Sequence, residues 1–287
     1  MSKKHNGKNI FQTTEYHNFI NQFIIRLIFS LIIFTSFHSS CLAQSPYKLD
    51  GKRESILFGS AIGLGIIGLT INDDIVPFTL DEINALNRND VNKFDRSATY
   101  NWSTTAASAT DFLAAALILS PAALAFSDEV RNDITPVLAM YLQTLILSET
   151  LPLVLKGITR RTRPYAYNED APIEEKQTAN ARRSFFSGHT SVAFAMAVFL
   201  STVYADYYPN SHWKPFVWGV SLLAASTVGY LRYEAGKHFP TDIITGAVVG
   251  SALGYFIPFI HRNGESDLDV SLGINGNGST INFHYKF

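Results

Sequence analysis

The chain has 287 residues and a formal net charge of −1; 47% of its residues are hydrophobic and 16% are charged. Since charged residues make up about a quarter of an average soluble domain, this composition excludes a disordered chain and predicts a dense globule or a membrane protein. The small net charge argues against a nucleic-acid partner. A single cysteine, Cys41, excludes a disulfide scaffold and a four-cysteine zinc site.

Residues 1–43 have the pattern of a secretory signal peptide. Three lysines precede the apolar stretch Phe23–Phe37, and small residues lead to Ala43. We predict cleavage after Ala43. An uncleaved anchor and a lipoprotein modified at Cys41 are the alternatives, although His38 stands where a lipoprotein signal usually has an aliphatic residue.

Residues 44–262 contain the helical part of the chain, with a motif-bearing core at 136–260. Six apolar segments of near-membrane length follow one another: Ser55–Ile71, Thr105–Phe126, Pro136–Leu155, His189–Ala205, Phe216–Tyr230 and Asp242–Ile260. They predict an all-α, six-helix bundle embedded in a membrane, with a soluble helical core as the alternative. Asp111, Gln143 and Glu149 are expected to face the bundle interior, because acidic groups facing lipid are costly.

Glycines recur every four residues in the last segment, at Gly246, Gly250 and Gly254. This spacing predicts close approach of a neighbouring helix. The polar stretch 72–102 has a capping-box pattern at Thr79–Glu82 and predicts a short surface helix, to which we assign no chemistry.

The tail, residues 263–287, alternates between apolar and polar residues on both sides of Asn275–Gly278. Alternation around an Asn-Gly turn predicts a β-hairpin.

Three polar motifs stand at the ends of the predicted helices. The first contains Lys156, Arg160, Arg161 and Arg163, four cations within eight residues. Arginine forks and a lysine ammonium can hold phosphate oxygens. The alternatives are the basic end of a helix and contacts with lipid headgroups.

The second motif opens the fourth helix with Ser187, Gly188 and His189. Ser187 is a candidate N-cap, Gly188 allows a ligand to approach the backbone, and free amides at a helix start bind anions. His189 could then protonate a leaving oxygen. An ordinary cap with an incidental histidine is the alternative.

The third motif contains Arg232, His238 and Asp242, with Pro240 at the predicted helix start. An aspartate one turn from a histidine can fix its tautomer and leave the other ring nitrogen free as nucleophile or base. A structural His–Asp pair is one alternative. A metal site is another, but the sequence shows no convincing third ligand. Since all three motifs fall at corresponding ends of successive helices, they are expected to share one face of the bundle.

The pattern Lys-x6-Arg-Pro, Ser-Gly-His and Arg-x5-His-x3-Asp resembles that of the type 2 phosphatidic acid phosphatases, whose superfamily includes bacterial class A acid phosphatases and vanadium haloperoxidases. The resemblance implies that His238 attacks phosphorus, Asp242 orients it, and His189 protonates the leaving oxygen and later activates water. It further implies no cofactor or metal and a set of phosphate-binding residues: Lys156, Arg163, Arg232, Ser187 and Gly188. Two positions depart from the family pattern: Phe186 replaces a proline, and Leu231 replaces a frequent serine.

The resemblance favours a bacterial envelope phosphatase whose substrate is a lipid phosphate or pyrophosphate. The alternatives are a soluble periplasmic acid phosphatase, a haloperoxidase with vanadate in the same anion site, and an inactive phosphate-binding membrane protein. Tyr165, Tyr167 and the loop 168–183 are candidates for substrate choice, because they join two motifs.

The expected location is the inner membrane, with the site facing the periplasm. If all six segments cross, however, a cleaved signal places the site in the cytoplasm. The two expectations agree if Ser55–Ile71 does not cross or if the bundle is not inserted.

Overall fold

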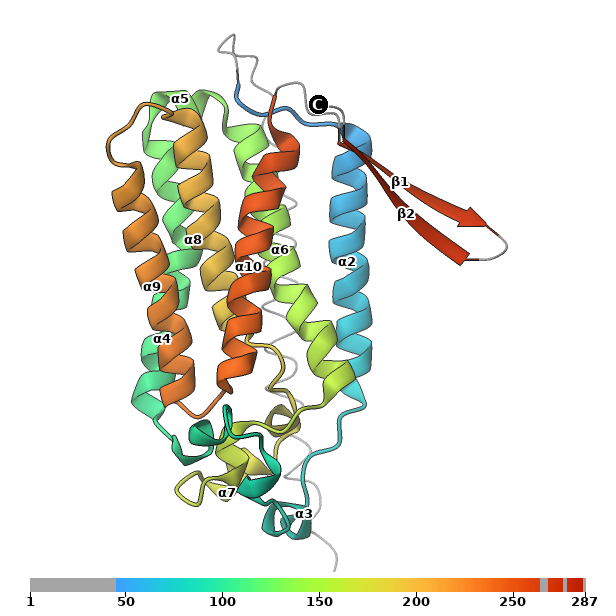
Figure 1. Ribbon diagram of the computed structural model, residues 1–287, viewed down its shortest axis with the longest axis vertical. Helices are drawn as coiled ribbons and strands as arrows, with labels where there is room; N and C mark the ends of the chain where they lie inside the picture. The colour runs from blue at the N-terminus through green and yellow to red at the C-terminus, as the bar shows by residue number, and fades with distance from the viewer. Residues whose placement is uncertain (1–44, 264–267, 276–277, 286–287) are drawn as a thin grey trace, which may run out of the picture.

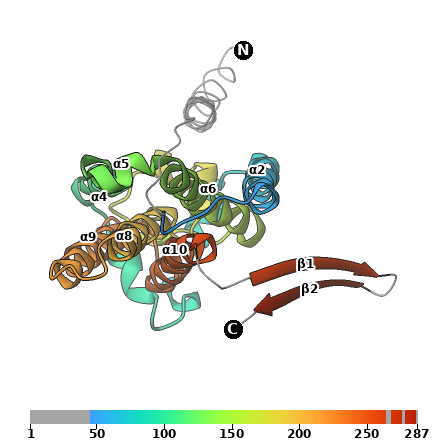
Figure 2. The same cartoon turned by 90° about the horizontal axis from the view of Figure 1, so that it is seen from above.

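The computed structural model describes residues 45–263, 268–275 and 278–285, which form a helical bundle and a two-stranded hairpin (Figure 1). The predicted signal peptide lies outside the described residues. The long helices are α2 (Gly51–Asp73), α4 (Thr104–Leu119), α6 (Ile134–Thr159), α8 (Gly188–Tyr207), α9 (Lys214–Glu234) and α10 (Pro240–His261). Viewed from above, α8 lies among the other helices of the bundle (Figure 2).

The described part contains more helices than the six expected, because the polar connections fold into short helices of their own. These are α3 (Leu80–Asn84), η1 (Arg88–Asp90), η2 (Arg96–Tyr100), η3 (Ser120–Phe126), α5 (Asp128–Asn132), η4 (Pro164–Tyr167), α7 (Ile173–Lys176) and η5 (Ala179–Arg182). The capping box predicted before α3 is confirmed: Thr79 Oγ1 accepts from the Glu82 amide at 3.2 Å, and the Glu82 carboxylate accepts from the Thr79 amide at 2.8 Å.

The glycine spacing in α10 brings this helix against α8, as predicted. A Cβ at Gly246, Gly250 or Gly254 would lie 2.6, 2.1 or 2.4 Å from a backbone oxygen of Ser187, Ser191 or Ala195 respectively. Since real Cβ atoms do not approach so closely, only glycine permits this packing. The contact fixes the start of α10 beside the start of α8, where two of the three motifs lie.

Within the described part of the chain, five helical segments are long and apolar enough to cross a membrane, and α9 is not among them. Large apolar side chains on the outer surface, such as Phe112, Leu223 and Val248, are 64–78% exposed, which is consistent with a membrane-embedded protein. Gln143 is buried in the bundle, as expected. The Asp111 side chain is 66% exposed, but its carboxylate faces the neighbouring helices, where it pairs with His189 of α8 and lies near Arg232 of α9.

Residues 45–50 lie at one end of the bundle, where the Lys48 amide donates to the carbonyl of His261 at 2.8 Å. After the bundle, the described residues form strands β1 (Leu268–Asn275) and β2 (Gly278–Tyr285), which pair antiparallel with Leu268 opposite Tyr285. Both views show these strands extending away from the helices.

Candidate active site

The three motifs meet at the end of the bundle opposite residues 45–50 (Figure 1). The first begins in the last turn of α6 and continues past its end, the second opens α8, and the third joins α9 to α10. The expectation that they share one face of the bundle is therefore confirmed. Connections containing α3 and α7 cover this end.

His238 is the central buried group of the site, with 1% exposure. Its Nε2 atom lies 3.5 Å from a terminal nitrogen of Arg163. Burial, together with the nearby cations of Arg163, Arg232 and Lys156, holds the pKa of His238 well below its ordinary value. The imidazole is therefore neutral and keeps a lone pair on one ring nitrogen, as a nucleophile requires.

The Arg163 guanidinium is fixed by the loop that precedes α8. Its Nε donates to the carbonyl of Asn180 at 2.9 Å, and one terminal nitrogen donates to Asn180 Oδ1 at 3.0 Å. The other terminal nitrogen, which faces His238, donates to the carbonyl of Lys237 at 3.1 Å. These bonds hold a cation beside the His238 ring. Sequence reasoning included Asn180 only as part of the loop 168–183, a candidate for substrate choice.

Two further cations and the start of α8 complete the positively charged side. Arg232 is 6% exposed, and a Cβ built on Gly188 would lie 3.4 Å from the ammonium nitrogen of Lys156. Ser187 is the N-cap of α8, as predicted: its Oγ accepts from the Thr190 amide at 3.4 Å and lies 2.8 Å from Thr190 Oγ1. The free backbone amides of this helix start thus lie beside a lysine ammonium.

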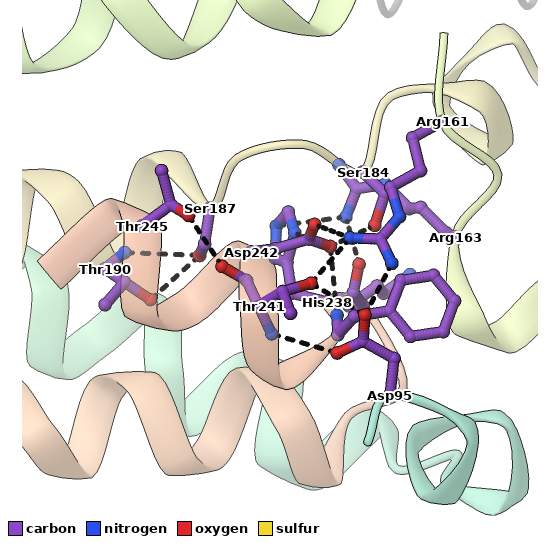
Figure 3. Close-up of polar contacts among 12 residues, drawn as sticks. Asp95, Arg161, Arg163, Ser184, Ser187, Thr190, His238, Thr241, Asp242 and Thr245 are labelled. Carbon is purple, nitrogen blue, oxygen red and sulfur yellow. Dashed lines mark hydrogen bonds and ion pairs between the residues drawn. The ribbon is translucent and has the colours of Figure 1, made fainter. Parts of the chain in front are cut away.

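Asp242 has more partners than the motif alone suggests (Figure 3). Its Oδ2 accepts from Ser184 Oγ at 2.5 Å and from the Phe239 amide at 3.0 Å, while its Oδ1 accepts from Arg161 at 2.5 Å. The distance from Oδ2 to His238 Nδ1 is 3.6 Å, which is too long for a hydrogen bond. Catalytic hydrogen bonds often shorten to full strength only around the substrate.

His189 pairs with a carboxylate from outside the three motifs. Its Nε2 lies 3.0 Å from Oδ1 of Asp111, in α4, and the same oxygen lies 3.9 Å from Arg232. Sequence reasoning singled out Asp111 only as an acidic residue in an apolar segment. Its alignment with His189 depends on how α4 is rotated, which the local sequence does not specify.

Sequence reasoning also missed Asp95, because it lies in the stretch to which no chemistry was assigned. Its carboxylate is fully buried and accepts from Arg161 at 2.7 Å. Among the described residues, no group of three His, Cys, Asp or Glu side chains could hold a metal ion.

Comparison with known proteins finds similar sequences for the part of the chain that carries this site. Residues 137–265 match the family model of the PAP2 superfamily. The chain is 35% identical over 105 residues to a probable diacylglycerol pyrophosphate phosphatase of Schizosaccharomyces pombe, covering 33% of this chain and 38% of the relative. It is 32% identical over 123 residues to a lipid A 4'-phosphatase of Porphyromonas gingivalis, covering 42% of this chain and 48% of the relative.

The transmembrane PAP2-type phosphatidylglycerolphosphate phosphatase of Bacillus subtilis matches in structure, with a TM-score of 0.40 and 19% identity over 83% of this chain and 94% of that one. The chain spans about 38–48% of the length of the two curated relatives. The match of residues 137–265 to the PAP2 superfamily model agrees with the resemblance of the three motifs.

Proposed function

We propose that the protein is a phosphatase that hydrolyses a phosphate monoester or pyrophosphate of a membrane lipid through a phosphohistidine. The observation that carries this proposal is a buried, neutral His238 whose Nε2 faces Arg163 within a cluster of cations. The names of the relatives, a diacylglycerol pyrophosphate phosphatase and a lipid A 4'-phosphatase, support a lipid substrate.

In the first step, Nε2 of His238 attacks phosphorus. The N–P bond forms as the bond to the leaving oxygen breaks, and protonated His189 gives its proton to that oxygen. The imidazole becomes cationic, with Nδ1–H directed at Asp242. Phosphoryl transfer needs positioning and neutralisation of charge above all, and we assign this role to the cations Lys156, Arg163 and Arg232, with the Gly188 amide.

In the second step, neutral His189 takes a proton from water as the water oxygen attacks phosphorus. The N–P bond breaks, inorganic phosphate leaves, and His238 and His189 return to their starting protonation states. Ser187 is assigned to phosphate binding as well; its hydroxyl proton is available for phosphate when Thr190 Oγ1 is the donor in the contact between the two side chains. The proposed steps use no metal or cofactor.

The test of this function is phosphate release by the purified protein in detergent. The panel contains phosphatidate, an isoprenoid pyrophosphate, a lipid A-like phosphate and a soluble aryl phosphate. We expect a lipid substrate to give the highest kcat/KM. Faster turnover of the soluble ester than of every lipid would favour the acid-phosphatase alternative. No release by folded protein would overturn the proposal and direct the work to vanadate-loaded halide oxidation or to phosphate binding alone.

An apolar groove beside the site supports a lipid over a soluble substrate. Its volume is about 200 Å³, and it lies between the end of α9 and the start of α10. Its lining residues are Gly229, Tyr230, Tyr233, Pro240, Ile243 and Ile244. Since the same two helix ends carry Arg232 and Asp242, an acyl chain in the groove would keep its phosphate near His238.

Filling this groove is expected to weaken turnover of long-chain lipids selectively. Ile244→Trp should raise KM for long-chain phosphatidate about tenfold, the loss expected when roughly two methylene groups are displaced, and leave aryl phosphate hydrolysis unchanged. Val248→Trp is the matched control, because Val248 lies one turn further along α10, is 64% exposed and does not line the groove. Equal effects of both variants, or of Ile244→Trp on both substrates, would rule out the groove as the binding site of the acyl chain.

We further propose that the protein lies in the bacterial inner membrane with its site facing the periplasm. Residues 45–50 and the site lie at opposite ends of the bundle, and α2 is long and apolar enough to cross. If α2 crosses, a periplasmic site requires residue 45 in the cytoplasm, so a cleaved signal and a periplasmic site exclude each other.

Labelling with a membrane-impermeant maleimide separates these arrangements. Cys41 is the only cysteine, so both variants are made in a Cys41→Ser background. We expect Glu169→Cys, exposed at the site end, to react in cells with a permeabilised outer membrane. Asn210→Cys, exposed at the other end, should react only after the inner membrane is disrupted. The reverse pattern would place the site in the cytoplasm and support signal cleavage.

A further inference from the structure

Asp95 lies outside the segment that matches the family model, yet it is bound into the site. It is fully buried in the connection before α4. Oδ2 accepts from Arg161 at 2.7 Å, from Thr241 Oγ1 at 2.7 Å and from Asn92 at 2.8 Å, while Oδ1 accepts from the Thr241 amide at 3.0 Å. Every acceptor direction of this carboxylate therefore points toward Arg161, the start of α10 or its own turn.

Arg161 connects Asp95 to Asp242. One terminal nitrogen donates to Asp95, and the other donates to Asp242 Oδ1 at 2.5 Å and to Thr241 Oγ1 at 2.8 Å. The guanidinium carbon of Arg161 lies 4.2 Å from the centre of the Phe239 ring, so the ring also packs against the guanidinium and stabilises its position. Figure 3 shows the Arg161 guanidinium in contact with both Asp95 and Asp242.

We propose that Asp95 and Arg161 are positioning residues that hold the Asp242 carboxylate in place and, through it, the His238 ring. This inference rests on the proposed phosphohistidine chemistry. Arg161 binds Oδ1 of Asp242, and this fixes the rotation of the carboxylate so that Oδ2 stays on the side of His238. Without that bond, Asp242 would keep only its contacts through Oδ2, with Ser184 and the Phe239 amide.

The charges explain why a second carboxylate is needed. Arg161 paired with Asp242 alone would neutralise the negative charge that His238 needs when it becomes cationic. With Asp95 on the other side of the guanidinium, the two carboxylates and one arginine carry a net charge of −1. Burial alone would raise the pKa of Asp95, but hydrogen bonds from Asn92, Thr241 and Arg161 hold it below its ordinary value, so Asp95 itself is ionised at neutral pH.

A purely structural role must be separated from this one, because Asp95 also binds the connection before α4 to the first turn of α10. Asp95→Asn removes the charge and retains an acceptor for the Thr241 amide. If Asp95 positions Asp242 and His238, kcat should fall about 30-fold and KM should change less than about threefold. The loss in kcat is expected because weakened charge-assisted hydrogen bonds cost about 2 kcal/mol. Rapid-quench measurement should show a full burst of phosphoenzyme that forms more slowly.

The structural alternative gives a different result: a reduced burst amplitude, from fewer folded molecules, with an unchanged rate constant. Asp90→Asn is the matched control, because Asp90 is an exposed carboxylate in the same connection, and it should keep wild-type kinetics. Arg161→Lys keeps the charge but cannot bridge two carboxylates, so it serves as a second test should Asp95→Asn fail to fold.

The double variant Asp95→Asn/Arg161→Lys should be no slower than the slower single variant, because both act through the same contact. Normal phosphoenzyme formation in either folded single variant, with active wild type, would overturn the inference and leave the proposed function standing. An inactive wild type would overturn both.

Discussion

His238→Ala is expected to lower phosphate release by about 10⁴-fold or more, because the variant has no atom that can form the N–P bond. The cations that surround the ring remain in place, and Arg163 keeps its bonds to Asn180. Binding of inorganic phosphate should therefore change little, while kcat falls for every substrate. The measurement is phosphate release from the preferred lipid in detergent, with phosphate binding followed by calorimetry.

The control is His212→Ala, since His212 is an exposed histidine in the connection between α8 and α9, away from the site. It should retain wild-type kcat and KM. Labelled phosphate recovered on His238 after an alkaline quench, and missing from His238→Ala, would establish the intermediate. Wild-type turnover by folded His238→Ala would rule out the nucleophile.

The order and ends of the helices could be predicted because their signals are local. The glycine repeat in α10, the Ser187 cap and the capping box at Thr79 each depend on residues within a turn or two of one another. Local signals also placed the three motifs at helix ends. Once the helices alternate in direction, these ends must meet, so the convergence of His238, Arg163 and Lys156 followed without tertiary information.

The supporting contacts could not be predicted because their partners are distant in sequence. Asp95 meets Arg161 66 residues later and Thr241 146 residues later. It stands in a polar stretch whose mixed charges are typical of a solvated surface. Asp111 belongs to an apolar helix whose rotation is set by packing, and Asn180 to a loop without periodicity. The role of a charged residue that lies far from any motif and is buried on folding can be recognised only from the tertiary structure.

Positively and negatively charged side chains occupy different parts of the site. Cations from the motifs surround the place where Nε2 of His238 would meet phosphate, whereas carboxylates lie behind the histidines. Asp242 stands behind His238, and Asp111 pairs with His189. In the proposed cycle, the first step turns His238 from neutral to cationic and His189 from cationic to neutral. A carboxylate beside each ring stabilises its charged form, so the two pairs support opposite halves of the same cycle.

His189→Gln provides the second large expected effect, and it should depend on the leaving group. Glutamine retains a polar group near Asp111 but cannot transfer a proton. For a lipid phosphate, whose leaving alkoxide is a strong base, loss of the general acid should lower kcat/KM about 10²- to 10⁴-fold. A nitrophenyl phosphate releases a phenolate, which leaves without a proton, so its first step needs little acid catalysis. Since kcat/KM reports this first step, kcat/KM for the nitrophenyl ester should fall far less.

The second step needs His189 with either substrate, because the attacking water is the same. With nitrophenyl phosphate, His189→Gln should therefore release a rapid burst of nitrophenol and then turn over slowly, as phosphorylated His238 accumulates. With the lipid, formation of the intermediate is itself slow, so no burst should appear. Asp111→Asn, which leaves His189 able to carry a proton, should show the same selectivity at about tenfold. Equal losses of kcat/KM on both substrates, without accumulation, would mean that His189 binds phosphate and transfers no proton.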